Sequence, residues 1–264
     1  MEAYPGDPYA YMPAGGRRRF HNIEGILPLV LLVVIAFFVL QFLHVIPCVI
    51  PVGCGGGANV IVLGVPSQAV VTTLSGKEAM MKGISYPINF DPSYVTIDML
   101  KNYNVVILQG DPYFDMNTRE VVRQYVDGGG KLIVVGDAGS KHPEYSNVAG
   151  WAWPSGQGIP VPAQIVGEWA GWSDTAYGSE LRWGNPNHPI VIGLKLIGAS
   201  TQAPTQVMKV TAKGSVIAAV DTNEGTIPAI IEGGSGFGNV LYFAYDPGQT
   251  PEILLTTVKY LAGI

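Results

Sequence analysis

The stretch DMNTREVVRQYVDGGGKLIVVGD, residues 115–137, decides how most of this 264-residue chain folds. Its apolar side chains recur at helical spacing between Val121 and Val126, and three glycines follow where a helix would end. The next segment, Lys131–Asp137, is a continuous apolar run rich in β-branched residues, which is typical of a strand buried on both faces. The stretch therefore predicts a helix followed by a buried strand, as in α/β proteins.

Similar apolar runs precede this unit. They are NVIVLGV at 59–65 and NVVILQG at 104–110, with a further helical candidate at 94–103. Continuous apolar strands separated by helices predict parallel pairing through right-handed crossovers. The last third of the chain alternates short strands with Gly- and Asn-rich turns before a final helix, predicted at 206–211, 216–221, 228–232, 239–245 and 250–261. The predicted fold class is α/β, an open, mostly parallel sheet flanked by helices, with a C-terminal β-meander.

The chain from Ala58 to Ile264 resembles the class I glutamine amidotransferase-like superfamily. The matching features are the NVIVLG strand, the NYNVVILQG strand, the helix followed by GGGKLIVVGD, and the ending GFGNVLYFAYDPGQTPEILLTTVKYLAGI. The resemblance implies a flavodoxin-like sheet. It also implies a catalytic Cys on the tight turn after a central strand, activated by a His and an acid that follow a later strand.

The residues at those positions do not fit this chemistry. The turn VGDAGS at 135–140 contains no Cys, and the late strand ends in Tyr245-Asp246-Pro247-Gly248 where the family has His-Pro-Glu. Ser140 and His142 lack the G-x-S-x-G elbow of a hydrolase, which favours an ordinary polar loop. We therefore assign no catalytic residue and expect no amidotransferase activity.

Three aspartates each follow a predicted strand, namely Asp111, Asp137 and Asp246. Ligands bind at the carboxyl ends of strands in open parallel sheets, so these side chains are candidates for binding a cation, a sugar or a basic partner. Ordinary turn chemistry is the alternative, because Asp before Pro or at the start of a helix stabilises a turn by itself. Neither a metal site nor a cofactor is assigned from the sequence.

All five tryptophans fall in an irregular segment, residues 139–189, that is rich in Gly, Pro and Ser: Trp151, Trp153, Trp169, Trp172 and Trp183. A connection of this length is usually functional or disordered, and tryptophan is depleted in disordered chains. The tryptophans are therefore expected to fix the insert on the sheet, to form a protein–protein surface, or to stack on carbohydrate. The sequence leaves these three interpretations open.

A long apolar run, Ile26–Ile46, precedes the α/β region. At ~1.5 Å rise per residue it is long enough to cross a ~30 Å hydrocarbon core as one helix. Arg17–Arg19 stand on its N-terminal side, which predicts a cytoplasmic N-terminus and an extracytoplasmic C-terminal domain. We therefore expect a single-pass protein of the cell membrane that contacts the lipid bilayer through residues 26–46.

The predicted organisation has four parts. They are a disordered cytoplasmic tail at 1–24, a transmembrane helix at 25–47, a Cys/Gly-rich linker at 48–57 and the extracytoplasmic domain at 58–264. Cys48 and Cys54 lie in the linker and are candidates for a disulfide bond. The net charge of −5 and the lack of a basic patch argue against nucleic-acid binding.

The expected function is that of a non-catalytic domain, an interaction or structural subunit of a membrane or cell-surface assembly. One alternative is a module that binds a sugar or small ligand at the carboxyl edge of the sheet. A further alternative is a hydrolase in which Asp137, Asp246 or Glu144 acts as general acid or base.

Overall fold

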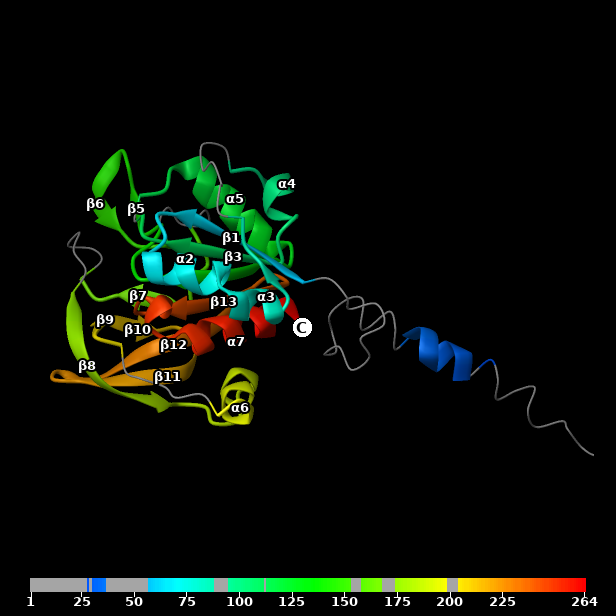
Figure 1. The fold of residues 1–264 in the computed structure, drawn as a ribbon. Coiled ribbons are helices and arrows are strands. Elements are labelled where there is room, and N and C mark those ends of the chain that lie inside the picture. Colours follow the sequence, from blue (N-terminus) through cyan, green and yellow to red (C-terminus); the bar gives the residue numbers. More distant parts are fainter. Residues whose placement is uncertain are drawn as a thin grey trace, which may run out of the picture. The chain divides into compact units, whose positions relative to one another are not determined.

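The computed structural model describes residues 28, 30–36, 57–87, 95–111, 113–152, 158–167, 174–198 and 204–264. The chain divides into two compact units, Met1–Gly53 and Cys54–Ile264, and the second contains the α/β domain (Figure 1). In the first unit the described residues 30–36 are helical. No helix within the described part of the chain has the length and apolar character needed to cross a membrane. Most of the run at 26–46, together with Cys48 and Cys54, lies outside the described residues.

A nine-stranded sheet forms the centre of the described domain, in the order β2-β1-β3-β4-β13-β12-β11-β8-β9. One half is parallel and consists of β2 (Ile84–Ser85), β1 (Ala58–Gly64), β3 (Val105–Gln109), β4 (Lys131–Val135) and β13 (Gly238–Phe243). The other half is antiparallel and adds β12 (Gly225–Ser235), β11 (Ser215–Thr222), β8 (Thr175–Trp183) and β9 (Gln206–Met208). Strand β13 belongs to both halves, because it pairs in parallel with β4 and antiparallel with β12.

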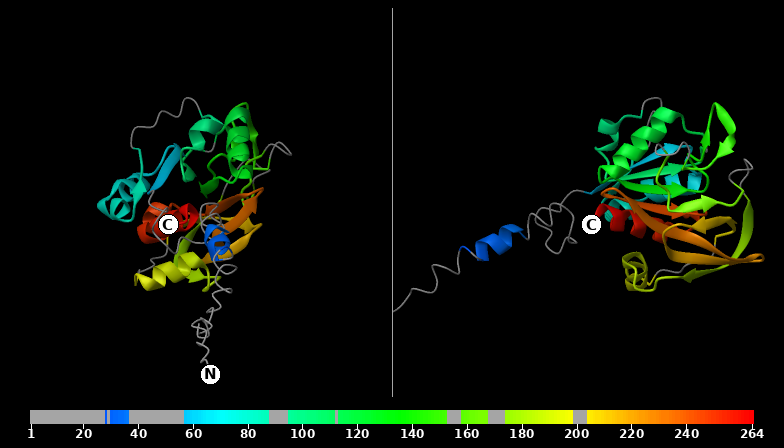
Figure 2. Two further views of the ribbon diagram at one scale, coloured as in Figure 1. Left: turned by 90° about the vertical axis from the view of Figure 1, so that its right-hand side faces the viewer. Right: turned by 180° about the vertical axis from the view of Figure 1, so that it is seen from behind.

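Helices cover both faces of the parallel half, as the two views of Figure 2 show. One face carries α4 (Ile97–Leu100) and α5 (Met116–Asp127), which contact each other. The other face carries α2 (Gln68–Ser75), α3 (Lys77–Met81) and α7 (Pro251–Ala262), with α6 (Pro189–Leu196) packed on α7. Two small antiparallel sheets of two strands each complete the described structure, β5 (Lys141–His142) with β6 (Tyr145–Ala149) and β7 (Ala163–Ile165) with β10 (Val210–Ala212).

The structure confirms the mixed α/β fold, and β11, β12 and β13 pair in succession as the predicted meander. The sheet is half antiparallel rather than mostly parallel, and one predicted strand differs. The meander strands are continuous with the parallel strands in one sheet. The strand predicted at 206–211 is split at Lys209, because the chain turns there to pair with other segments. The Lys209 N–H donates to the Asp174 carbonyl at 2.8 Å, and the Lys209 carbonyl accepts from the Val166 N–H at 3.0 Å. The residues after Lys209 therefore join β7 rather than the main sheet.

Candidate functional site

The strand order of the parallel half reverses between β1 and β3, since the chain runs outward to β2 and returns on the other side of β1. Ligands of open α/β sheets bind outside the carboxyl ends of the strands at such a reversal. Here the two strand ends touch through glycines with positive φ, 100° at Gly64 and 83° at Gly110. A Cβ on Gly110 would lie only 1.7 Å from the Val65 carbonyl oxygen. Backbone therefore fills the reversal point, and the ends of β3, β4 and β13 are left as the place for a site.

The three predicted aspartates lie along that edge on neighbouring strands. Asp111 follows β3, Asp137 follows β4 and Asp246 follows β13, and all three are half-buried. The first two turns touch, because the Gly139 N–H donates to the Asp111 carbonyl at 3.0 Å. Within the described residues, no three His, Cys, Asp or Glu side chains form a group that could hold a metal ion.

The carboxylates of Asp246 and Asp111 accept hydrogen bonds that stabilise turns. Asp246 Oδ1 accepts from Gln109 Nε2 at 3.1 Å and from the Gly248 N–H at 2.9 Å, which ties β13 to β3 and caps the 3-10 helix η2 (Pro247–Gln249). Asp111 Oδ1 accepts from the Tyr113 N–H at 2.8 Å. These contacts are the turn chemistry that the sequence offered as the alternative to ligand binding.

Asp137 differs from the other two. Its carboxylate has no hydrogen bond or ion pair with any described residue, and it follows Gly136, whose φ is 60°. It stands on the turn where the resembling family carries its nucleophile. The pKa of the buried Tyr242 phenol lies well above its usual range. Burial is the larger cause, and the negative charge of Asp137 is the smaller one. Tyr242 therefore stays protonated at neutral pH.

Arg119 of α5 supports the Asp137 turn from the buried side. Only 1% of the residue is exposed, and its Nη2 donates to the Gly139 carbonyl at 2.6 Å and to the Gly150 carbonyl at 3.4 Å. Burial lowers the pKa of the guanidinium to about 10, so it remains charged at neutral pH. Arg119 was not predicted from the sequence as a functional residue. Its position three residues before the buried Val122 was the available signal, because that spacing places it on the inner face of α5.

Ser140 and His142 do not form a nucleophile–base pair. Both are buried, but Ser140 Oγ has no hydrogen-bond partner among the described residues. His142 Nδ1 accepts from the Glu144 N–H at 3.1 Å. A general base must lie within hydrogen-bond reach of the proton it takes, so this geometry favours the polar-loop interpretation. A small cavity of about 270 Å³ lies beside His142, between this loop and the start of α5.

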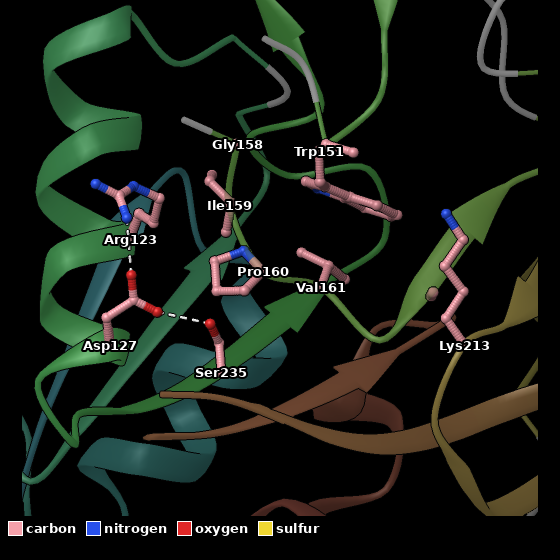
Figure 3. Close-up of a pocket in the computed structure, with 11 residues that line it drawn as sticks. Arg123, Asp127, Trp151, Gly158, Ile159, Pro160, Val161, Lys213 and Ser235 are labelled. Carbon is pink, nitrogen blue, oxygen red and sulfur yellow. Dashed lines mark hydrogen bonds and ion pairs between the residues drawn. The ribbon is translucent and has the colours of Figure 1, made fainter. Parts of the chain in front are cut away.

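A larger cleft of about 420 Å³ lies between α5, the insert and the turns of the antiparallel half (Figure 3). Its apolar wall comes from the insert and includes Trp151, Ile159, Pro160 and Val161. The facing wall is a hydrogen-bonded chain, in which Asp127 accepts from Arg123 Nη1 at 2.8 Å and from Ser235 Oγ at 2.6 Å. Figure 3 shows Lys213 on the far side of the opening from this chain. The cleft thus combines one apolar wall with one charged wall.

The tryptophans that the structure describes hold the insert in place. Trp151 is 2% exposed, donates through Nε1 to the Ala138 carbonyl at 2.8 Å, and meets the Tyr242 ring edge-on at 5.5 Å between centroids. Trp183 is half-buried in β8 against the core. Trp151 therefore has almost no surface to offer to a protein or a sugar. Trp153, Trp169 and Trp172 lie outside the described residues.

Comparison with known proteins bears on the fold. No protein-family model and no curated protein matches the chain. A solved structure of a cytoplasmic protein from Salmonella typhimurium is 15% identical, covers 77% of this chain and 98% of its own, and has a TM-score of 0.50. A ThuA-like protein from Bacteroides uniformis is 15% identical, with coverages of 78% and 91% and a TM-score of 0.48.

A β-galactosidase from the haloarchaeon Halorubrum lacusprofundi is also similar, at 14% identity and a TM-score of 0.49. The match covers 79% of this chain but 30% of that enzyme. At these identities the likeness to the Salmonella typhimurium protein shows a shared mixed α/β fold and no more.

Proposed function

We propose that this chain is a single-pass, membrane-anchored protein whose α/β domain is a non-catalytic interaction or structural subunit of a membrane or cell-surface assembly. The apolar run at 26–46 supports the anchor. The basic residues Arg17–Arg19 support a cytoplasmic N-terminus and an extracytoplasmic domain.

The proposal that the domain is non-catalytic rests on which residues lie at the carboxyl ends of the strands and on what they bind. Asp246 stands near the position of the family's late His, and its carboxylate is occupied by Gln109 and Gly248. Ser140 makes no hydrogen bond to His142. The polar groups in these contacts shape turns, which supports a domain that works by contact rather than by turnover.

An exposed apolar strip on α6 supports the interaction role. Ile192, Leu196 and Ile197 are all exposed, while Ile190, Val191 and Leu194 of the same helix are buried against the domain. Clustered exposed apolar side chains mark interaction surfaces in proteins. We assign a protein partner to this strip, which we call the α6 strip.

The test is purification of the full-length protein from membranes in mild detergent, followed by mass spectrometry of what accompanies it. A partner should be recovered in a fixed ratio with the unmodified protein, and Leu196→Glu should remove it. Tyr177→Glu is the control, because Tyr177 of β8 is also a largely exposed apolar side chain and lies outside the α6 strip. Recovery of the lone protein under several extraction conditions would count against the proposal.

A second function, binding of a sugar or another small polar ligand, is favoured by one observation. The Asp137 carboxylate stands at the carboxyl edge without a partner among the described residues. Titration calorimetry against a panel of mono- and oligosaccharides tests this. Asp137→Asn should abolish any heat of binding, whereas Asp98→Asn, at an exposed surface position, should leave it intact.

A further inference from the structure

We propose that the amino edge of the sheet rests on the membrane surface, with Met80, Met81 and Phe237 in contact with lipid. The amino edge is the row of segments that lead into the parallel strands: 80–83 before β2, 101–104 before β3, 128–130 before β4 and 236–237 before β13. The inference rests on the membrane anchor of the proposed function and adds an orientation to it.

The three side chains are far more exposed than apolar side chains usually are. The exposed fractions are 89% for Phe237, 80% for Met81 and 65% for Met80. The parallel register brings them to one edge, since β13, β4, β3, β1 and β2 all begin there. Figure 1 shows α3, which ends in the two methionines, at the same end of the domain as the start of β1 and the C-terminus.

The Phe237 turn is fixed to the end of α5, so a loose loop does not explain its exposure. The Phe237 N–H donates to the Asp127 carbonyl at 3.3 Å, and Ser235 Oγ donates to Asp127 Oδ1 at 2.6 Å. Gly238 packs so closely that an added Cβ would lie 2.1 Å from the Val126 carbonyl oxygen. The packing of this turn therefore holds Phe237 outward.

The two methionines are joined directly to the start of the domain. The Gly83 N–H donates to the Met80 carbonyl at 3.0 Å, and the Gly83 carbonyl accepts from the Ala58 N–H at 2.7 Å. Methionine is flexible and polarizable, which suits contact with irregular apolar surroundings such as acyl chains. The apolar side chains thus lie next to the residue at which the chain enters β1.

We assign lipid as the partner of the amino edge because of the segment that connects this edge to the predicted membrane span. Residues 48–57 connect the predicted span to Ala58, and a chain extends by at most ~3.3–3.6 Å per residue. The start of β1 therefore stays within roughly 40 Å of the bilayer whenever the span is inserted. Lys101 and Lys131 lie on the same edge, and long basic side chains suit the headgroup region. The connecting residues 48–57 therefore keep the bilayer within reach of the amino edge.

The experiment places full-length protein, labelled with ¹³C at its methionine methyl groups, in lipid nanodiscs. Spectra are compared between unmodified lipids and lipids that carry a nitroxide near the headgroup. The Met80 and Met81 signals, assigned through Met80→Leu and Met81→Leu, should lose most of their intensity in the nitroxide discs. Met208 is the internal control and should keep its intensity, because its methyl group lies beside Gly136 at the carboxyl edge, the opposite edge of the sheet from Met80 and Met81.

Phe237→Ser should restore much of the Met80 and Met81 intensity by weakening the contact, whereas Tyr177→Ser should not. If the protein fails to co-elute with nanodiscs, the predicted membrane anchor is wrong, and the proposed function is wrong with it. Co-elution with unchanged Met80 and Met81 signals would overturn this inference alone. Broadening that depends on protein concentration in both kinds of disc would also overturn it, because a second copy would then cover the edge.

Discussion

Glu232 shows how a single residue joins one strand, β12, to β13, α6 and α7. From β12 its Oε1 accepts from Tyr260 Oη at 2.7 Å and from Asn239 Nδ2 at 2.8 Å. Its Oε2 lies 2.9 Å from His188 Nε2. His188 Nδ1 accepts from the Ile190 N–H and caps α6, so Nε2 carries the proton and donates. Burial raises the pKa of Glu232, but these three hydrogen bonds outweigh burial and leave the pKa below its usual value.

The first prediction concerns the dependence of stability on pH. A lowered pKa in the folded state contributes stability above the unfolded value of about 4.3, and that stability is lost as the pH falls through the folded pKa. Glu232→Gln should therefore cost about 1–3 kcal/mol in urea unfolding at pH 7, with a smaller loss near pH 3. Glu180→Gln, at an exposed position, is the control. Equal losses at both pH values would contradict the prediction.

The second prediction concerns Arg119. Replacing it by Met leaves the buried Gly139 and Gly150 carbonyls without their donor, so we expect a loss of about 2–3 kcal/mol. Arg119→Lys should recover little of this loss, because an ammonium lacks the planar fork of a guanidinium. Arg123→Met, whose ion pairs are partly exposed, should cost roughly 1 kcal/mol or less. Guanidinium unfolding measures all three, and equal losses for the two Met variants would refute the assignment.

At the scale of elements, burial decides what the sequence could predict. Strands β1, β3 and β4 are buried on both faces and read as continuous apolar runs, and α5 keeps a helical period. Strand β8 was missed in the insert because it is half exposed and irregular near Gly178, where its register with β11 shifts. Helix α6, PIVIGLKL, is a short apolar run whose period does not distinguish helix from strand.

The sequence could place the residues of the candidate site only by showing where the strands end. Asp111, Asp137 and Asp246 follow strands that the sequence revealed, so their common edge could be foreseen. The bond between Gln109 and Asp246 joins residues 137 positions apart, and no local pattern reveals such a contact. The parallel pairing of β13 with β4 escaped prediction for the same reason.

The third prediction tests the closed contact between β1 and β3. Gly110→Ala combines a φ of 83° with a Cβ 1.7 Å from the Val65 carbonyl oxygen, so we expect a loss above roughly 3 kcal/mol or failure to fold. Gly225→Ala is the matched control, because its φ is also positive, at 122°, but no atom lies within 4 Å of the new Cβ. It should cost only about 1 kcal/mol. Thermal unfolding compares the two, and similar losses would show that the close approach is unimportant.

At the scale of the whole molecule, the chain consists of two units, each with its own internal contacts. The fourth prediction is that a fragment containing residues 54–264 folds by itself. Its Tm should lie within about 2–4 °C of the corresponding transition in the full-length protein, which is the shift that 1 kcal/mol produces at this size. Differential scanning calorimetry of both proteins measures this. A larger drop, or a fragment without a cooperative transition, would show that the first unit contributes to the stability of the second.

The position of β13 between the two halves of the sheet also sets the order of events during synthesis. Strand β4 cannot gain its second neighbour until Gly238–Phe243 has left the ribosome, and α7 must follow before its contacts with β1 can form. At ~5–20 residues per second the delay after β4 is on the order of 5–20 s. During that interval one edge of β4 stays unpaired, and an open apolar strand edge invites association with other chains. The nascent chain is thus most vulnerable to aggregation while residues 136–243 are being made, and a chaperone would help it most in that interval.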